Sequence, residues 1–112
     1  MAEVHGRRRE ALRRLLDGRG LDALLVTNLL NVRYLTGFTG SNAALLVTAD
    51  GAVFCTDSRY ETSSRTQVPD LERVIERDCA LALAARAEGR TGFESDHVTV
   101  DGLQDAGRRH PG

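Results

Sequence analysis

The chain has 112 residues, of which 41% are apolar and 28% are charged, and its formal net charge is −1. This length allows one domain with a hydrophobic core and is too short for two, so residues 1–112 are predicted to form a single domain. The near-neutral charge and the 4% aromatic content argue against general affinity for nucleic acid or membranes. No segment has the ~20 apolar residues that a membrane span requires.

The two cysteines, Cys55 and Cys79, have neither metal-ligand spacing nor the density of a disulfide-stabilised scaffold. Cys55 lies within an apolar run, where a reduced and buried thiol is the ordinary state. The first residues include several arginines, but no apolar stretch long enough for a signal peptide follows them. A cytoplasmic protein is therefore expected.

Residues 4–17 are predicted to form an amphipathic helix that ends near Gly18 and Gly20. One face is apolar and the other is basic, and their members are Ala11, Leu12, Leu15 and Leu16, and Arg7, Arg9, Arg13 and Arg14, respectively. The arginines form either a solvated helix face or a phosphate-binding patch. We favour the solvated face, because no aromatic or amide side chains that read nucleic acid accompany them.

The apolar run at residues 21–27 is typical of a central strand that is covered on both faces. A loop is predicted to begin at residues 27–28 and to extend to about Asn31. One helical turn is predicted over residues 32–35, before Gly37.

The strongest local signal is a β-hairpin, with apolar runs at residues 43–47 and 52–56 and an Asp-Gly turn at 49–51. The later elements are predicted to be a helix at 58–67, a strand at 71–77, a helix at 79–88 that stops at Gly89, a strand at 91–94 and a helix at 99–109. This alternation predicts a three-layer α/β fold, with a mixed β-sheet of about five to six strands and helices on both faces.

Few residues suggest chemistry. The three histidines are isolated in the sequence, at His5, His97 and His110. Glu94, Asp96 and His97 form the densest group of possible metal ligands, but we favour a polar loop, because three neighbours in a loop do not by themselves form a coordination shell. Neither Ser41 nor Ser58 lies in a nucleophile-elbow motif. We therefore predict no catalytic residue, no metal ligand and no cofactor in this chain.

A polar corner is predicted at residues 57–60, after the second strand of the hairpin. Asp57 is placed to accept hydrogen bonds from the first amides of a following helix. Arg59 is suited to bidentate pairing with a carboxylate, and Tyr60 has an apolar ring with a polar tip. We favour structural roles for Asp57 and Tyr60. The alternative is that Arg59 faces a substrate or another subunit.

The segment before the hairpin supplies the other candidates for a substrate cleft or an interface, which are Arg33, Tyr34, Gly37, Phe38, Ser41 and Asn42. It joins two buried elements and carries both apolar and polar groups, a mixture typical of ligand-lining loops. A place in the core is equally compatible with Tyr34, and the residues alone leave both possibilities open.

Two pieces of the sequence resemble a known family. NVRYLTGFTGSNAALLVT (31–48) and DGAVFCTDSRYETSS (50–64) are similar to the amino-terminal domain of the Xaa-Pro peptidases, which include aminopeptidase P, prolidase and creatinase. The resemblance implies a mixed sheet of about six strands between helices. It also implies that activity belongs to a carboxy-terminal pita-bread domain, absent from this chain. There, two Asp, one His and two Glu hold two divalent metal ions, usually manganese.

By the same analogy, the amino-terminal domain shapes the substrate cleft and contributes oligomer contacts. Residues 33–38 would approach the cleft, and residues 57–60 would brace the domain. The implied partners are its own catalytic domain, further copies of the full-length protein and short proline-containing peptides. The leading hypothesis is a non-catalytic domain of an Xaa-Pro metallopeptidase, inactive as a fragment. The alternatives are a binding module without catalysis, a domain of a creatinase-like amidinohydrolase and, more remotely, a nucleic-acid-binding protein.

Overall fold

The computed structural model of the chain describes residues 2–94. Its elements are α1 (Ala2–Gly18), β1 (Ala23–Val26), α2 (Leu29–Thr36), β2 (Ala43–Thr48), β3 (Ala52–Thr56), η1 (Ser58–Tyr60), α3 (Glu61–Gln67), β4 (Glu72–Ile75), α4 (Cys79–Ala84) and β5 (Thr91–Phe93). The 3-10 turn η1 continues directly into α3, and together they form the helix predicted at 58–67. The helix predicted at 99–109 lies outside the described residues. No helix within residues 2–94 is long and apolar enough to cross a membrane.

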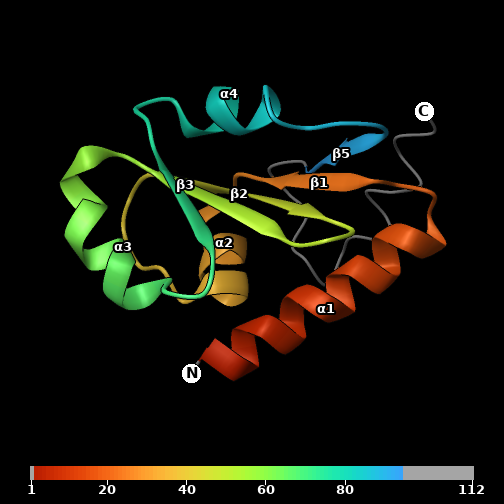
Figure 1. Ribbon diagram of the computed structural model, residues 1–112, viewed down its shortest axis with the longest axis horizontal. Coiled ribbons are helices and arrows are strands. Elements are labelled where there is room, and N and C mark those ends of the chain that lie inside the picture. Colours follow the sequence, from red (N-terminus) through yellow and green to blue (C-terminus); the bar gives the residue numbers. More distant parts are fainter. Residues whose placement is uncertain (1, 95–112) are drawn as a thin grey trace.

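The described strands form one mixed sheet in the order β4-β3-β2-β1-β5 (Figure 1). Neighbours among β1, β2 and β3 are antiparallel, whereas β4 pairs with β3, and β5 with β1, in parallel. α4 covers one face of the sheet, and α1 and α2 cover the other. The predicted α/β fold, with a mixed sheet between helices, is therefore confirmed.

Both faces of the central strands are buried, because successive side chains of a strand point to opposite sides. In β2, Leu45 and Val47 pack with α1 and α2, whereas Ala44 and Leu46 pack with α4. β1 is divided in the same way, and all four of its residues are buried. The uninterrupted apolar runs in the sequence thus reflect two hydrophobic clusters, one on each side of the sheet.

The predicted hairpin is present as β2 and β3, with Ala43 opposite Thr56. Its turn is closed by the amide of Thr48, which donates to the carbonyl of Gly51 at 2.8 Å. α4 is shorter than predicted and ends at Ala84. After it, the amides of Arg86 and Ala87 bond to carbonyls three residues back, so a tighter turn ends the α-helix before the predicted stop at Gly89.

The prediction of a solvated arginine face on α1 is wrong for Arg9, which is 5% exposed. Arg9 Nη1 donates to the carbonyl of Leu35 at 2.8 Å, and Nη2 pairs with Asp70. Arg8 Nη1 donates to the carbonyl of Tyr34 at 2.9 Å. The last carbonyls of a helix lack partners within the helix, so these two arginines of α1 stabilise the carboxyl end of α2. In contrast, Leu15 of the predicted apolar face is exposed.

α2 is two turns long and begins three residues earlier than the helical turn predicted at 32–35. The side chain of Asn28 caps it, accepting from the amides of Leu30 at 2.9 Å and Asn31 at 3.3 Å. Asn31, expected in a loop, is buried in the helix and donates to Glu94 Oε2 at 2.6 Å. The other carboxylate oxygen of Glu94 accepts from the amides of Thr27 and Asn28. The loop prediction overlooked the local cap at Asn28, whereas the contacts with Glu94 join distant parts of the chain.

Candidate functional site

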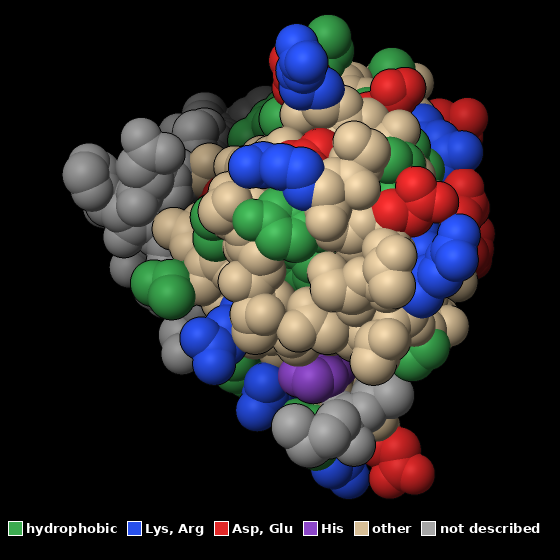
Figure 2. All heavy atoms as spheres, turned by 90° about the vertical axis from the view of Figure 1, so that its left-hand side faces the viewer, with side chains coloured by type: hydrophobic (Ala, Val, Ile, Leu, Met, Phe, Trp, Pro, Cys, Tyr) green, Lys and Arg blue, Asp and Glu red, His purple; other side chains and the backbone are tan. Residues whose placement is uncertain are grey.

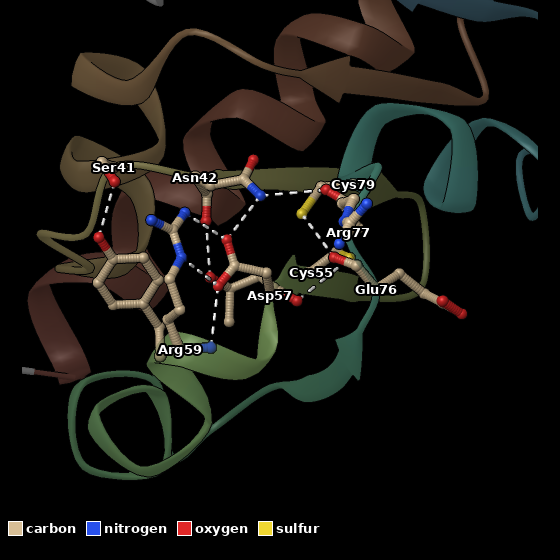
Figure 3. A network of polar contacts seen from close by, with 10 residues as sticks. Ser41, Asn42, Cys55, Asp57, Arg59, Glu76, Arg77 and Cys79 are labelled. Carbon is tan, nitrogen blue, oxygen red and sulfur yellow. Dashed lines mark hydrogen bonds and ion pairs between the residues drawn. The ribbon is translucent and has the colours of Figure 1, made fainter.

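A polar network lies where β3 and β4 end and β2 begins (Figure 3). At its centre, the carboxylate of Asp57 accepts from the backbone amide of Arg59 at 2.9 Å, which caps η1. The guanidinium of Arg59 holds the same carboxylate in bidentate fashion, from Nε at 3.0 Å and from Nη2 at 2.7 Å. The hydrogen bonds that the sequence suggests for these two residues are thus present.

Asn42 connects this pair to the neighbouring strands. Its amide Nδ2 donates to Asp57 Oδ2 at 2.8 Å and to the carbonyl of Arg77 at 3.1 Å. The hydroxyl of Thr56 donates to the carbonyl of Asn42 at 2.6 Å. Asn42 directly precedes β2, and Thr56 ends β3, so the hairpin register brings the two together. The network therefore connects the polar corner at residues 57–60 to the adjacent ends of β2, β3 and β4.

Electrostatics keep the Asp57 carboxylate ionised. The hydrogen bonds from Arg59 and Asn42 hold the pKa of Asp57 well below its usual range. The same pair raises the pKa of Arg59. Both carboxylate oxygens already accept from nitrogen donors, which makes Asp57 a poor general base and a poor metal ligand. In contrast, the side chain of Arg59 is 67% exposed, and its outer edge faces solvent.

A cleft of about 530 Å³ adjoins the network, lined by Asn42, Asp57, Ser58, Arg59, Ile75, Glu76 and Arg77. Its lining carries two carboxylates and two guanidinium groups. No histidine belongs to this lining within the described part of the chain, so no imidazole is there to activate Ser58. This arrangement is suited to binding and orienting a polar ligand rather than to nucleophilic chemistry.

Phe38 and Tyr60 connect the corner to the core. The rings of Phe38 and Tyr60 meet edge to face with centroids 5.5 Å apart, and Phe38 also lies 4.9 Å from Phe54. The hydroxyls of Tyr60 and Ser41 are 2.7 Å apart, and this hydrogen bond lowers the pKa of Tyr60. A Cβ at Gly40 would lie 2.4 Å from the Phe38 ring. Phe38 is 2% exposed, which corrects the expectation that its ring lines a surface cleft.

Arg33, Tyr34 and Gly37 lie apart from this corner, at the carboxyl end of α2. Gly37 ends the helix in the left-handed conformation with φ 84°, and a Cβ there would lie 2.7 Å from the His5 ring. Tyr34 is 41% exposed, and the Arg8 guanidinium lies 4.3 Å from the centroid of its ring.

The candidate residues thus fall into two surface groups, with Phe38 buried between them. The sequence did not single out His5 and Arg8, which line a second cleft of about 820 Å³ together with Arg33 and Tyr34. Nor did it single out Gln67, whose side-chain Oε1 accepts a hydrogen bond from the backbone amide of Thr39 at 3.2 Å. No local signal could have identified these residues, because each is brought to α2 or to the following loop from a distant segment.

A metal site is not formed by the residues between 2 and 94, where no three His, Cys, Asp or Glu side chains are grouped suitably. Glu94 of the suggested ligand group binds the amino end of α2, as described above. Its proposed companions Asp96 and His97 lie outside the described residues. The resemblance assigns the two divalent metal ions to a carboxy-terminal domain, and the described side chains of this chain form no group suited to hold them.

Together, fold and site define a small α/β domain with a mixed sheet and a rigid polar corner. Residues 8–110 match the family described as the Creatinase/Prolidase N-terminal domain, so the chain belongs to this family. An uncharacterized peptidase, YqhT, from Bacillus subtilis (strain 168) is 40% identical over 96 residues, which are 80% of this chain and 27% of that protein. The chain therefore spans about a quarter of the length of this curated relative.

Solved structures show the same similarity. The N-terminal domain of the cytoplasmic peptidase PepQ from Mycobacterium tuberculosis H37Rv is 53% identical with a TM-score of 0.78, and the match covers 91% of this chain and 82% of that one. An Xaa-Pro aminopeptidase from Streptococcus pyogenes is 35% identical with a TM-score of 0.74, and the match covers 95% of this chain and 84% of that one. The family resemblance stated from the sequence is confirmed.

Proposed function

We propose that this chain is the non-catalytic amino-terminal domain of a metal-dependent Xaa-Pro peptidase of the cytoplasm. Its role is to shape the substrate cleft and to contribute to oligomer contacts in the full-length protein. Membership of the family and the peptidase names of the relatives support this proposal. The divalent metal, manganese or a similar ion, belongs in this proposal to the carboxy-terminal catalytic domain, the first partner of this chain.

The observation that carries the proposal is the exposed but oriented guanidinium of Arg59. Nε and Nη2 are held by Asp57, and Asp57 is held by Asn42. Arg59 Nη1 donates no hydrogen bond to the described residues, and the side chain is 67% exposed. A cation that is fixed before binding loses little conformational freedom when it pairs with a carboxylate. In the proposed function, Arg59 binds the terminal carboxylate of a short proline-containing peptide.

The test is steady-state kinetics of the full-length protein on an Xaa-Pro dipeptide with manganese. Arg59→Gln should raise KM at least ~10-fold with a smaller effect on kcat, because a charge-assisted hydrogen bond to bound substrate is lost. Arg65→Gln is the matched control, since Arg65 is also exposed and pairs with Glu61 on the surface of α3. The isolated chain should show no hydrolysis.

Three results would count against the proposal. Hydrolysis by the isolated chain, freed of contaminating peptidases, would show that it is catalytic. Equal KM values for the two arginine variants would remove the role of Arg59. Release of product from creatine but not from Xaa-Pro peptides would instead favour the amidinohydrolase alternative.

A further inference from the structure

The second cleft, of about 820 Å³, lies between the amino end of α1, α2 with the loop that follows it, and the carboxyl end of α3 with Pro69. The charged and titratable nitrogen groups of its lining come from His5, Arg8 and Arg33. No carboxylate belongs to this lining among the described residues. Figure 2 shows the face that includes α3 and the start of α1. Basic side chains lie at its lower left without neighbouring carboxylates, whereas those on its right lie beside most of the carboxylates of this face.

The two arginines of this cleft are held differently. Arg8 is fixed, because it donates to the carbonyl of Tyr34 and lies over the Tyr34 ring. Arg33 is exposed and makes no ion pair with any residue between 2 and 94. Asp70 acts electrostatically on His5, but its carboxylate is already paired with the buried guanidinium of Arg9. Within residues 2–94, the cleft therefore presents positive charge that no carboxylate of its lining compensates.

His5 contributes hydrogen bonding rather than charge. Burial and the neighbouring Arg8 and Arg9 lower its pKa, whereas Asp70 acts in the opposite direction. With an ordinary pKa near ~6.5, a lowered value leaves the imidazole neutral at physiological pH. The positive charge of the cleft therefore belongs to the guanidinium groups, which keep it over the whole physiological range.

Apolar surface adjoins these charges. Leu30 is 73% exposed and Tyr34 is 41% exposed, and both line the cleft together with Pro69. Exposed large apolar side chains next to unpaired cations are typical of a surface that binds a partner. An inorganic anion would use only the charges, whereas a peptide that carries both a carboxylate and an aliphatic side chain would use both features.

We propose that this cleft docks an acidic peptide segment of a partner protein, with carboxylates on Arg8 and Arg33 and an aliphatic side chain on Leu30 and Tyr34. Nucleic acid fits less well. The chain has a formal net charge of −1, and the exposed ring of Tyr34 is already covered on one side by Arg8. This inference does not depend on the peptidase proposal, because it rests on the lining of this cleft and not on Arg59 or on catalysis.

The test is fluorescence anisotropy of the 112-residue chain with a short, labelled and end-capped peptide of glutamate and leucine. Peptides with glutamine or lysine in place of glutamate are the matched probes. The acidic peptide should bind most tightly, and binding should weaken as salt is raised from low to physiological concentration, because exposed charges are screened beyond ~8 Å.

Matched variants test whether the acidic peptide binds in this cleft. Arg33→Glu should weaken binding of the acidic peptide at least ~5-fold, because it replaces an attractive charge with a repulsive one. Arg14→Glu makes the same charge change on an exposed part of α1 away from the cleft and should stay within ~2-fold. Leu30→Ala should weaken binding ~3-fold or more, whereas Leu81→Ala, at an equally exposed leucine on α4, should have no effect. Circular dichroism verifies the fold of each variant, and Arg33→Gln replaces any Arg33→Glu protein that is unfolded.

Several results would overturn the proposal. They are equal affinity for the acidic and glutamine peptides, an equal loss of affinity in the Arg33→Glu and Arg14→Glu variants, and no binding of the acidic peptide at millimolar protein concentration. Displacement of the peptide by an equal concentration of inorganic phosphate would indicate a simple anion site. Tighter binding of a duplex oligonucleotide than of the acidic peptide would indicate a nucleic-acid surface instead.

Discussion

Arg9→Met should be among the most destabilising single substitutions on α1, although it replaces an arginine of a basic helix face. Methionine keeps much of the aliphatic stem and removes both hydrogen-bonding contacts of the guanidinium. The carbonyl of Leu35, at the buried end of α2, then loses its side-chain donor. The carboxylate of Asp70 loses its partner but is 31% exposed, so water can solvate it.

The magnitude follows from these two losses. A buried carbonyl without a donor costs ~1–3 kcal/mol. The partly exposed ion pair adds at most ~1 kcal/mol. The free energy of unfolding should therefore fall by ~1–4 kcal/mol, which lowers Tm by ~5–20 °C in a chain of this size.

Urea unfolding followed by circular dichroism measures this difference. Arg7→Met is the control, because Arg7 is exposed on the same helix and makes no side-chain hydrogen bond within residues 2–94. Asp70→Asn should cost less than Arg9→Met, since the Leu35 contact remains. Equal midpoints for Arg9→Met and Arg7→Met would refute the reasoning. An equal loss from Asp70→Asn would assign the effect to the ion pair rather than to the carbonyl.

Three further predictions concern acid stability, thiol reactivity and packing. The lowered pKa of Asp57 means that its stabilisation is present above the ordinary value of ~3.9 and is lost as the pH falls below it. Asp57→Asn should therefore flatten the acid limb of a pH-unfolding profile, and an unchanged limb would contradict this. Burial raises the pKa of Cys55 and raises that of Cys79 to about 12, so both thiols should react with iodoacetamide only on unfolding, and rapid labelling of the native protein would disprove it. Phe38→Ala should cost ~3–5 kcal/mol in urea unfolding against ~1 kcal/mol for Tyr34→Ala, and similar losses would place the two rings in equivalent environments.

The features that the sequence predicted correctly are local ones. The hairpin follows from two apolar runs and an Asp-Gly turn within a few residues. The corner follows from Asp57 and Arg59, which are two positions apart and pair with each other. Neighbouring residues of this kind interact in most contexts, so composition and spacing are sufficient to predict the contact.

The features that were missed depend on distant partners. Arg9 is 26 positions from Leu35 and 61 from Asp70, so no window of sequence relates them. Periodicity also could not separate Leu12, which is buried, from Leu15, which is exposed, because both fit an apolar helical face. For Phe38, a loop position between glycines suggested exposure, but the ring packs inward between Phe54 and Tyr60. Tertiary packing decided these cases.

α2 has a consequence for how the chain folds. A helix of two turns is far below the ~12–15 residues needed for stability in water, so it does not persist alone. Its amino end is held by Glu94, and its carboxyl end by Arg8 and Arg9, which belong to opposite ends of the described chain. The stability of α2 therefore depends on α1 and Glu94, and loss of either contact should speed the exchange of its amide protons. The surface that carries Arg33 exists only in the assembled protein, so a ligand of that surface discriminates folded from partly folded chains.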